Sequence, residues 1–423
     1  MNDEVIALPV LDTNYPIKTV EGASHSCVLF TEGNVKCWGR NNFGEVGNGL
    51  IGEGDGFQVN SPVKVNGITD AKDISAGTYH TCALLKSNKV ICWGAAGSGR
   101  LGFTPPVTNP VTTAIPSPLQ SQYVNGLSGS IPLKAIYSGG DFNCVLLEDG
   151  SEIKCWGLNG SGGAAASGLG GWLGIGSSTA DTDTATTVTA LDNVLLGRKI
   201  VDLAAGNRHI CAILSNSGSV YCWGNNNYAQ LGVGTVTTPT VISLPTGSTP
   251  TVLNGATAIS TKLFHTCAVV SDHVQCWGKN ANAQSGAPVS ATVNSPLEIR
   301  KSDVDSPTSE YLNIDNVKVG SAHSCATTKT GEITCWGSST SGKLGIGDGV
   351  VQRHNASPPI ALSQTVSSQF MGSGEIHNCA YFGPAKGFYC WGDNTWGQLG
   401  IGVDNTLNPP IPPAQASVPT KVF

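Results

Sequence analysis

The chain has 423 residues, of which only 12% are charged, and a formal net charge of −6. Sequence-independent nucleic-acid binding needs clustered Lys and Arg, and no basic run occurs, so we expect no nucleic-acid partner. No apolar run approaches the roughly 20 residues of a membrane span. The N-terminal residues MNDE also lack the basic start and apolar core of a signal peptide.

One pattern recurs seven times along the chain. In the first copy, a Gly-x-x-His-x-Cys segment beginning at Gly22 is followed by Cys-Trp-Gly at residues 37–39. The first cysteines of the seven copies are separated by 54 to 67 residues. Such a period is too long for most helical repeats and is typical of a propeller blade with loops of variable length.

Each copy predicts a β-hairpin. In the second copy, a strand that includes Ile74 and residues 82–85 is followed by a turn at 86–89 and a returning strand at 90–93. Gly-containing turns at the matching place in other copies are hairpin signals. We expect hairpin cores near residues 17–47, 72–102, 134–174, 200–232, 258–286, 316–345 and 370–400.

All fourteen cysteines belong to these hairpins, two in each copy. A tight hairpin sets its two cysteines opposite each other on antiparallel strands, within disulfide range. We therefore predict one disulfide per copy: Cys27–Cys37, Cys82–Cys92, Cys144–Cys155, Cys211–Cys222, Cys267–Cys276, Cys325–Cys335 and Cys379–Cys390. Because regular disulfides persist in oxidising compartments, we expect a secreted, cell-surface or periplasmic protein whose signal peptide is absent from this numbering.

The combined motif, Gly-x-x-His-x-Cys followed by Gly-x-Val-x-Cys-Trp-Gly-x-Asn-x-x-Gly-Gln-Leu-Gly, resembles the regulator of chromosome condensation repeat. The resemblance covers nearly the whole chain. It implies an all-β fold: a single seven-bladed β-propeller over residues 1–423, with four-stranded antiparallel blades. The version with paired cysteines resembles the extracellular bacterial branch of this family.

The ends of the chain suggest how the ring closes. Residues 417–423 repeat the pattern Ser-Pro-Val-Lys-Val of residues 61–65, and no hairpin follows them. We expect the C-terminal strand, residues 416–423, to complete the first blade and so remove an exposed sheet edge.

Two copies depart from the pattern. The third has Phe142 where the others have His, and a Gly/Ala/Ser-rich insertion over residues 157–171. The fifth has Gln284-Ser285-Gly286 in place of Gln-Leu-Gly. We expect these blades to pack less regularly than the others.

We expect residues that recur in nearly every blade to stabilise the fold and not to bind a partner. Six histidines precede a first cysteine by two positions, and each lies in a separate blade, so we expect buried side chains that hydrogen-bond backbone within their own blade. They are His25, His80, His209, His265, His323 and His377. The tryptophan of each Cys-Trp-Gly should pack between blades. We expect no metal site and no cofactor.

Binding should depend on the positions that vary. The residue before Gly/Ala-Gln-Leu-Gly is aromatic in three blades, as Phe43, Tyr228 and Trp396, although Ser or Asn serves in others. Exposed aromatic side chains on a rigid scaffold are candidate hot spots. The strand order places these loops on the same face as the Gly-x-x-His segments. We therefore expect a binding surface made of Phe43, Tyr79, Trp172, Arg208, Tyr228, Phe264 and Trp396.

The sequence favours a non-enzymatic extracellular propeller that binds a protein partner through this face. A surface adhesin, or a carbohydrate-binding or structural module, is the alternative. A secreted inhibitor of the β-lactamase-inhibitor type and a propeller lyase are further alternatives, although no acid/base constellation for an enzyme is recognisable. Fold alone does not identify the partner.

Overall fold

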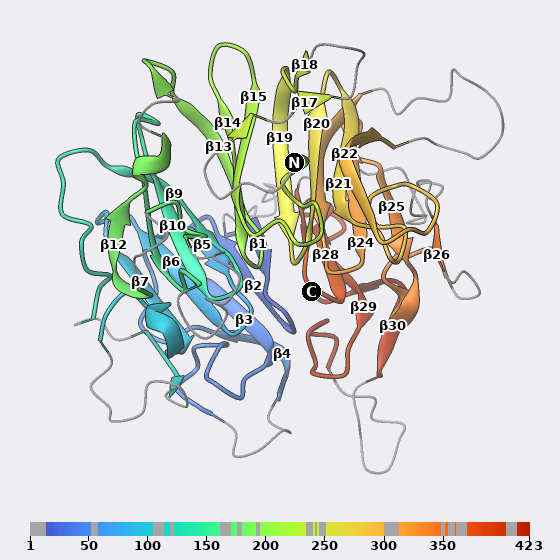
Figure 1. The fold of residues 1–423 in the computed structure, drawn as a ribbon. Helices are drawn as coiled ribbons and strands as arrows, with labels where there is room; N and C mark the ends of the chain where they lie inside the picture. The colour runs from blue at the N-terminus through green and yellow to red at the C-terminus, as the bar shows by residue number, and fades with distance from the viewer. Residues whose placement is uncertain are drawn as a thin grey trace, which may run out of the picture.

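The computed structural model describes residues 14–51, 58–104, 114–118, 122–160, 171–175, 180–191, 195–233, 240–241, 243–244, 251–299, 313–347, 352–353, 360, 370–402 and 413–423. Seven four-stranded antiparallel sheets follow one another around a ring in chain order (Figure 1), as the sequence predicts. In each blade the innermost strand comes first and the outermost strand comes last. The first three strands of each blade begin and end within the expected hairpin spans or at most two residues outside them.

The strands of each blade have the following bounds. Blade 1 contains β1 (Pro16–Glu21), β2 (His25–Phe30), β3 (Val35–Arg40) and β4 (Gln58–Lys64). Blade 2 contains β5 (Ala71–Ala76), β6 (His80–Leu85), β7 (Val90–Ala95) and β8 (Ala114–Ile115). Blade 3 contains β9 (Leu133–Ser138), β10 (Phe142–Leu147), β11 (Ile153–Gly157) and β12 (Thr182–Thr187). Blade 4 contains β13 (Ile200–Ala205), β14 (His209–Leu214), β15 (Ser219–Gly224) and β16 (Thr240–Val241).

The remaining blades follow the same plan. Blade 5 contains β19 (Ala256–Lys262), β20 (His265–Val270), β21 (His273–Lys279) and β22 (Thr292–Glu298). Blade 6 contains β23 (Ile314–Val319), β24 (His323–Thr328), β25 (Ile333–Ser338) and β26 (Gln352–Arg353). Blade 7 contains β27 (Phe370–Ser373), β28 (His377–Tyr381), β29 (Phe388–Asp393) and β30 (Gln415–Lys421). A small hairpin, β17 (Ser243–Leu244) with β18 (Thr251–Val252), separates blades 4 and 5. Short 3-10 helices in the described ranges include Gly97–Gly99, Thr189–Leu191 and Thr340–Gly342.

The seven predicted disulfides are confirmed. In every blade the two cysteines are register partners on the second and third strands, as Cys27 and Cys37 are on β2 and β3. Their Cα atoms lie 4.0 to 4.1 Å apart across the seven pairs, and no cysteine is free. The cysteines are buried in the blade cores, and each disulfide stabilises its hairpin mainly by restricting the unfolded chain.

The prediction that residues 416–423 complete the first blade is wrong. Strand β30 pairs with β29, so it is the outer strand of blade 7, while β1 to β4 fill blade 1. The physical reason is that the chain before the first hairpin already supplies β1, which leaves no vacancy in that blade. The Pro-containing pattern shared by residues 61–65 and 417–423 therefore marks a fourth strand in both blades.

Side chains close the ring instead of a shared strand. The ring of Phe423 stacks on Phe388 of its own blade, with centroids 5.2 Å apart, and lies 6.0 Å from Phe30 of blade 1. The Ser26 hydroxyl of blade 1 lies 2.7 Å from Nε2 of His377 in blade 7. The last residue of the chain thus contributes to closure through its side chain.

A repeated polar unit joins neighbouring blades, as blades 1 and 2 show. The indole Nε1 of Trp93 donates to the carbonyl oxygen of Glu45 in the preceding blade at 2.9 Å, and the Thr81 hydroxyl donates to the same oxygen at 3.0 Å. Nε2 of His25 lies 3.0 Å from that hydroxyl. All seven Cys-Trp-Gly tryptophans are buried, which confirms that they pack between blades.

The histidines are buried as predicted, but their Nε2 partners are not backbone groups of their own blade. Each bonds a Ser, Thr or Asn side chain of the next blade: Thr81, Asn143, Thr266, Ser324, Asn378 and Ser26. Burial lowers the pKa of each from 6.5, to about 3 for His25, so these rings are neutral hydrogen-bonding groups. In blade 1 the glycine three residues earlier leaves room for the ring, because a Cβ on Gly22 would lie 2.1 Å from the His25 ring.

The seam between blades 3 and 4 is the apolar exception. Phe142 stands where the others have His, and Ile210 stands where the next blade has Ser, Thr or Asn; both belong to one buried cluster. Nε1 of Trp223 has no hydrogen-bond partner among the described residues. Blade 3 thus packs less regularly, as expected. Blade 5 keeps the regular indole bond, since Trp336 still donates to the Gln284 carbonyl at 3.0 Å, but the Gln284 amide nitrogen has no hydrogen-bond partner among the described residues.

Candidate functional site

Two sets of loops meet at one end of every blade, and we call this end of the ring the binding face. The residue before each histidine position accepts a backbone hydrogen bond from the second residue after the blade's tryptophan, as Ser24 does from Arg40. The same bond occurs in all seven blades. Both loops therefore lie at the same end of the hairpin, so the predicted loops share one face.

The first cluster on this face, which we call the first arc, spans blades 7, 1 and 2. It consists of Arg40, Phe43, Tyr79 and Trp396. The guanidinium carbon of Arg40 lies 4.8 Å from the Tyr79 ring centroid, 5.2 Å from that of Trp396 and 5.7 Å from that of Phe43. The Phe43 and Tyr79 rings contact each other with centroids 5.6 Å apart. All four side chains are partly exposed.

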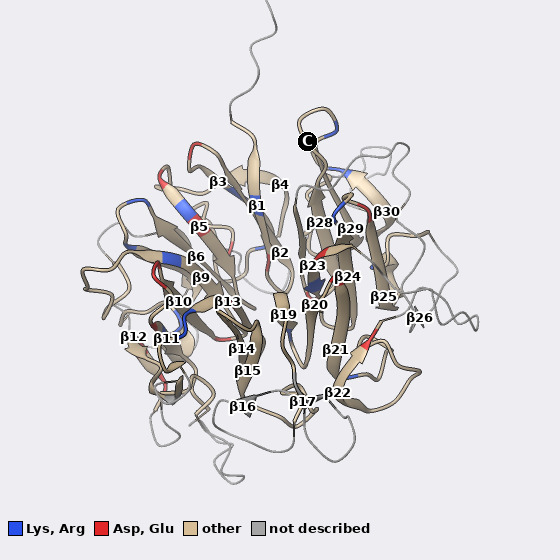
Figure 2. Cartoon of the chain, turned by 90° about the horizontal axis from the view of Figure 1, so that it is seen from above, with Lys and Arg blue, Asp and Glu red and all other residues tan. Residues whose placement is uncertain are grey.

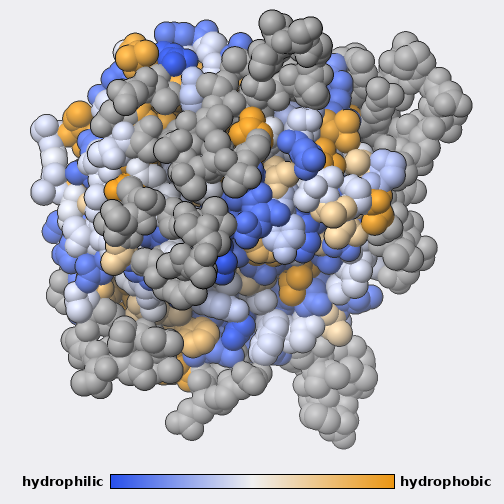
Figure 3. All heavy atoms as spheres, viewed as in Figure 1, coloured by the Kyte–Doolittle hydropathy of each residue, from blue (hydrophilic) through white to orange (hydrophobic). Residues whose placement is uncertain are grey.

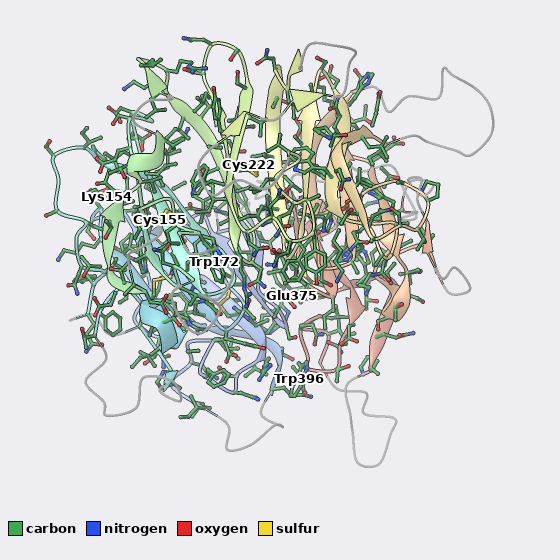
Figure 4. All side chains as sticks on the ribbon, in the orientation of Figure 1. Lys154, Cys155, Trp172, Cys222, Glu375 and Trp396 are labelled. Atoms are coloured by element: carbon green, nitrogen blue, oxygen red, sulfur yellow. A yellow bond between two sulfur atoms is a disulfide. The ribbon has the colours of Figure 1, made fainter. Side chains whose placement is uncertain are left out.

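The second arc spans blades 3, 4 and 5 and consists of Trp172, Arg208, Tyr228, Phe264 and Lys279. The Arg208 guanidinium carbon lies 4.8 Å from the Trp172 ring centroid. Tyr228 and Phe264 contact each other with centroids 4.8 Å apart, and the Lys279 ammonium lies 5.3 and 5.5 Å from the two rings. The two arcs include all seven residues expected on this surface. Figure 4 labels Trp172, Trp396 and, between them in that view, Glu375.

Trp172 differs from the expectation of an exposed aromatic, because its side chain is 5% exposed. It occupies the place held by Gln230 in blade 4 and Gln398 in blade 7, and it packs under Arg208 and against Gly160, where a Cβ would lie 2.8 Å from the indole. The exposed group at this point of the face is therefore the Arg208 guanidinium.

Blade 1 replaces an amide pair of the repeat by an ion pair. In blade 4 the Gln230 amide bonds the Tyr228 backbone N–H at 2.9 Å and the Asn225 side chain at 2.9 Å. Blade 1 has Glu45 and Arg40 at the matching positions. Glu45 accepts the Phe43 N–H at 2.9 Å and lies 4.0 Å from Nε of Arg40. Burial raises the pKa of Glu45 to about 7, and the Arg40 charge opposes that shift.

The inner strands enclose a cavity of about 560 Å³ on the ring axis. Its wall carries charged residues, among them the buried Glu21 and the partly exposed Asp202, Lys262 and Lys318. Burial raises the pKa of Glu21 to about 7 and lowers the pKa values of Lys262 and Lys318. Gly372 gives the Glu21 carboxylate its space, since a Cβ there would lie 1.7 Å from a carboxylate oxygen.

Lys262 bridges the mouth of this cavity on the binding face. It replaces the glycine of Gly-x-x-His in blade 5, and its ammonium donates to the Glu21 carbonyl of blade 1 at 2.7 Å. The altered residue extends β19 so that Lys262 pairs with His265, and the turn then needs a positive φ of 35° at Leu263. Backbone bonds between loops, such as Glu375 N–H to the Gly22 carbonyl at 3.3 Å, narrow the mouth further.

Sequence reasoning missed four residues of this face: Arg40, Glu45, Lys279 and Lys262. Each stands where most other blades carry a different residue type, so an alignment of the seven copies could have found them. Figure 2 shows Lys and Arg interspersed with Asp and Glu along the ribbon, and Figure 3 shows hydrophobic residues in small groups among hydrophilic ones.

Neither a metal centre nor a membrane-spanning helix is found among the described residues. No group of three or more His, Cys, Asp or Glu side chains there is arranged to hold a metal ion. None of the helices in the described ranges has the length and apolar character needed to cross a bilayer.

Family models match much of the repeat. One model, described as the regulator of chromosome condensation (RCC1) repeat, matches residues 71–100, 133–162, 200–230 and 314–343. A second model with the same description matches residues 32–84 and 217–269.

Curated proteins with the same kind of repeat are similar in sequence. The ultraviolet-B receptor UVR8 of Arabidopsis thaliana is 27% identical over 81% of this chain and 70% of the receptor. The E3 ubiquitin-protein ligase HERC2 of Homo sapiens is 27% identical over 89% of this chain, but the match covers only 7% of the ligase. This chain thus corresponds to a small part of that ligase.

Solved structures share the fold. Prp20p from Saccharomyces cerevisiae, described together with its binding properties to Gsp1p and histones, aligns with a TM-score of 0.69 at 21% identity over 97% of this chain and 88% of Prp20p. Human WBSCR16 aligns with a TM-score of 0.68 at 19% identity over 86% of each chain.

Proposed function

The chain is a seven-bladed propeller built from regulator of chromosome condensation repeats, and from this premise we propose that it binds a protein partner through the two arcs of its binding face. The proposal is not enzymatic. The observation that carries it is the grouping of the seven residues predicted for this surface into cation–aromatic clusters that span blade seams.

The physical argument is preorganisation. Aromatic and Arg side chains are enriched at binding hot spots, and here they are held by disulfide-bonded hairpins and by contacts with each other. Rings fixed before binding lose little conformational entropy on docking. Prp20p, with the same fold, is described as binding Gsp1p and histones, which supports a protein partner over a glycan.

The test is capture of partners from an extract of the source organism. The triple variant Phe43→Ala, Tyr228→Ala, Trp396→Ala should lose the captured protein, with its melting temperature nearly unchanged. Tyr15→Ala is the matched control, because Tyr15 is 42% exposed at the start of β1, away from the binding face. Capture that is unaffected by the triple variant, or selective binding to a glycan array with no protein captured, would contradict the proposal.

We also propose that the protein works in an oxidising compartment, as a secreted, surface or periplasmic molecule. Seven disulfides with no free cysteine support this, since such bonds do not persist in a reducing cytosol. The native protein, alkylated during lysis without reductant, should show no modified cysteine by mass spectrometry. Fully alkylated cysteines, or a protein confined to the cytosolic fraction, would refute it.

A further inference from the structure

Two cations of the second arc have no carboxylate partner among the described residues. Neither Arg208 nor Lys279 forms an ion pair with any described residue within 4 Å. Arg208 is exposed and Lys279 is partly exposed. Both instead lie over aromatic rings: Arg208 over Trp172, and Lys279 over Tyr228 and Phe264. This is unusual on a chain whose formal net charge is −6.

Two other cations on the same face are compensated by carboxylates. Arg40 of the first arc faces the carboxylate of Glu45 at 4.0 Å. Arg100, between the two arcs, forms a 2.8 Å ion pair with Asp141. Within the described residues, Arg208 and Lys279 therefore lack the ion pair that Arg40 and Arg100 form.

Contact with a ring covers one side of a cation and leaves its other N–H groups free to donate. A guanidinium over an indole still offers its edge to a carboxylate, in the bidentate geometry that Arg favours. Tyr228, which is 37% exposed, and the partly exposed Phe264 supply apolar area beside the two cations. The surface thus combines two cations that can bind anions, Arg208 and Lys279, with the apolar surface of two aromatic rings.

We propose that the second arc docks an acidic segment of a protein partner, with carboxylates on Arg208 and Lys279 and an apolar or aromatic side chain against Tyr228 and Phe264. This inference rests on the proposed function and names the chemistry of the partner. Charge complementarity carries it: the site offers positive charge without internal compensation, so carboxylates from outside complete it.

The experiment uses the purified full chain and synthetic copolymers as probes. Fluorescent poly(Glu,Tyr) should bind, whereas poly(Lys,Tyr) should not, and the affinity should fall as salt rises from 50 to 500 mM because exposed charges are screened. Since the chain as a whole is negative, binding of an acidic polymer requires a local cationic site. Arg208→Gln with Lys279→Gln should weaken poly(Glu,Tyr) binding by about tenfold.

The matched control is Lys89→Gln. Lys89 also lies over an aromatic ring, 4.3 Å from the Tyr123 centroid, but in the hairpin turn at the opposite end of blade 2. The Lys89→Gln variant should bind poly(Glu,Tyr) with unchanged affinity. Equal loss in the control, an unchanged affinity in the double variant, or preference for poly(Lys,Tyr) would overturn the inference.

The two proposals fail in different ways. If the aromatic triple variant loses the captured protein while Arg208→Gln with Lys279→Gln retains it at full level, only the acidic-segment inference fails. If the aromatic triple variant retains the captured protein, the proposed function fails whatever the copolymers show.

Discussion

Both arcs of the binding face combine cations with aromatic rings, but they differ in whether a carboxylate neutralises the cation. In the first arc, Arg40 sits among three rings and is compensated by the buried Glu45. In the second, Arg208 and Lys279 lie over rings and have no carboxylate partner within the described ranges, and the seam between blades 3 and 4 is apolar. The difference shows that repeat-breaking residues come in coupled sets, because changing one buried polar group obliges its partner to change as well.

Acidification should affect the polar seams far more than the apolar one. Burial holds the pKa of His25 near 3, whereas an unfolded histidine titrates near 6.5. The unfolded chain therefore takes up protons that the folded chain refuses, and stability is lost as pH falls below 6.5. Each such histidine costs about 2–3 kcal/mol at pH 4.5. Burial raises the pKa values of the Glu21 and Glu45 carboxyls, so acidification favours the folded chain at these two groups. The six histidines outnumber them.

Urea unfolding at pH 7.5 and 5 measures this effect. The double variant His25→Phe, Thr81→Ile gives the blade 1–2 seam the composition of the blade 3–4 seam, and should reduce the pH dependence by one histidine. The reciprocal variant Phe142→His, Ile210→Thr should increase it. An acid sensitivity that neither variant changes would show that the seam histidines do not control stability.

Lys262 links the two arcs across the cavity mouth, because it precedes Phe264 of the second arc and bonds the Glu21 carbonyl beside the first. Lys262→Met keeps the stem but removes the ammonium. Loss of a charged hydrogen bond and of the counter-charge to Glu375 should cost about 2–4 kcal/mol of stability. Hydrogen exchange should quicken at the Glu375 amide, which bonds the Gly22 carbonyl. An unchanged free energy of unfolding and an unchanged exchange rate at the Glu375 amide would mean that the Lys262 hydrogen bond does not stabilise the mouth of the cavity.

The ion pair of the first arc can be converted to the amide pair of blade 4. Because the pKa of Glu45 is raised from 4.5 to about 7 in the folded chain, this residue takes stability away as pH rises from 4.5 to 7. The variant Arg40→Asn, Glu45→Gln should remove that loss and gain about 2–3 kcal/mol at pH 8 relative to pH 4.5. Guanidinium unfolding at the two pH values tests it, and Lys72→Gln with Glu148→Gln, an exposed ion pair, is the control. An identical pH response in wild type and variant would contradict it.

The features that recur in every blade could be predicted from the sequence, whereas the contacts between residues that replace the repeat's usual side chains could not. Seven hairpins, their disulfides and the shared face followed from spacing, because period and strand alternation determine which residues meet. The closing strand was misassigned because a fourth-strand pattern looks the same in blade 1 and blade 7. Trp172 was expected to be exposed because the insertion hides its alignment with Gln230. Contacts between blades, such as Lys262 with Glu21, join residues far apart in the chain and leave no local pattern.

The smallest predicted difference separates the regular seam of the first arc from the irregular seam of the second. Trp38 donates to the Gln398 carbonyl at 2.9 Å, whereas Nε1 of Trp223 has no partner among the described residues. Both indoles are fully buried, so Trp→Phe removes a similar volume from each. Trp38→Phe should cost about 1 kcal/mol more than Trp223→Phe, since only the first loses a hydrogen bond. Parallel urea titrations measure the loss in the free energy of unfolding for each variant. Equal losses would show that the indole hydrogen bond adds nothing to the stability of the seam. A larger loss for Trp223→Phe would contradict the prediction.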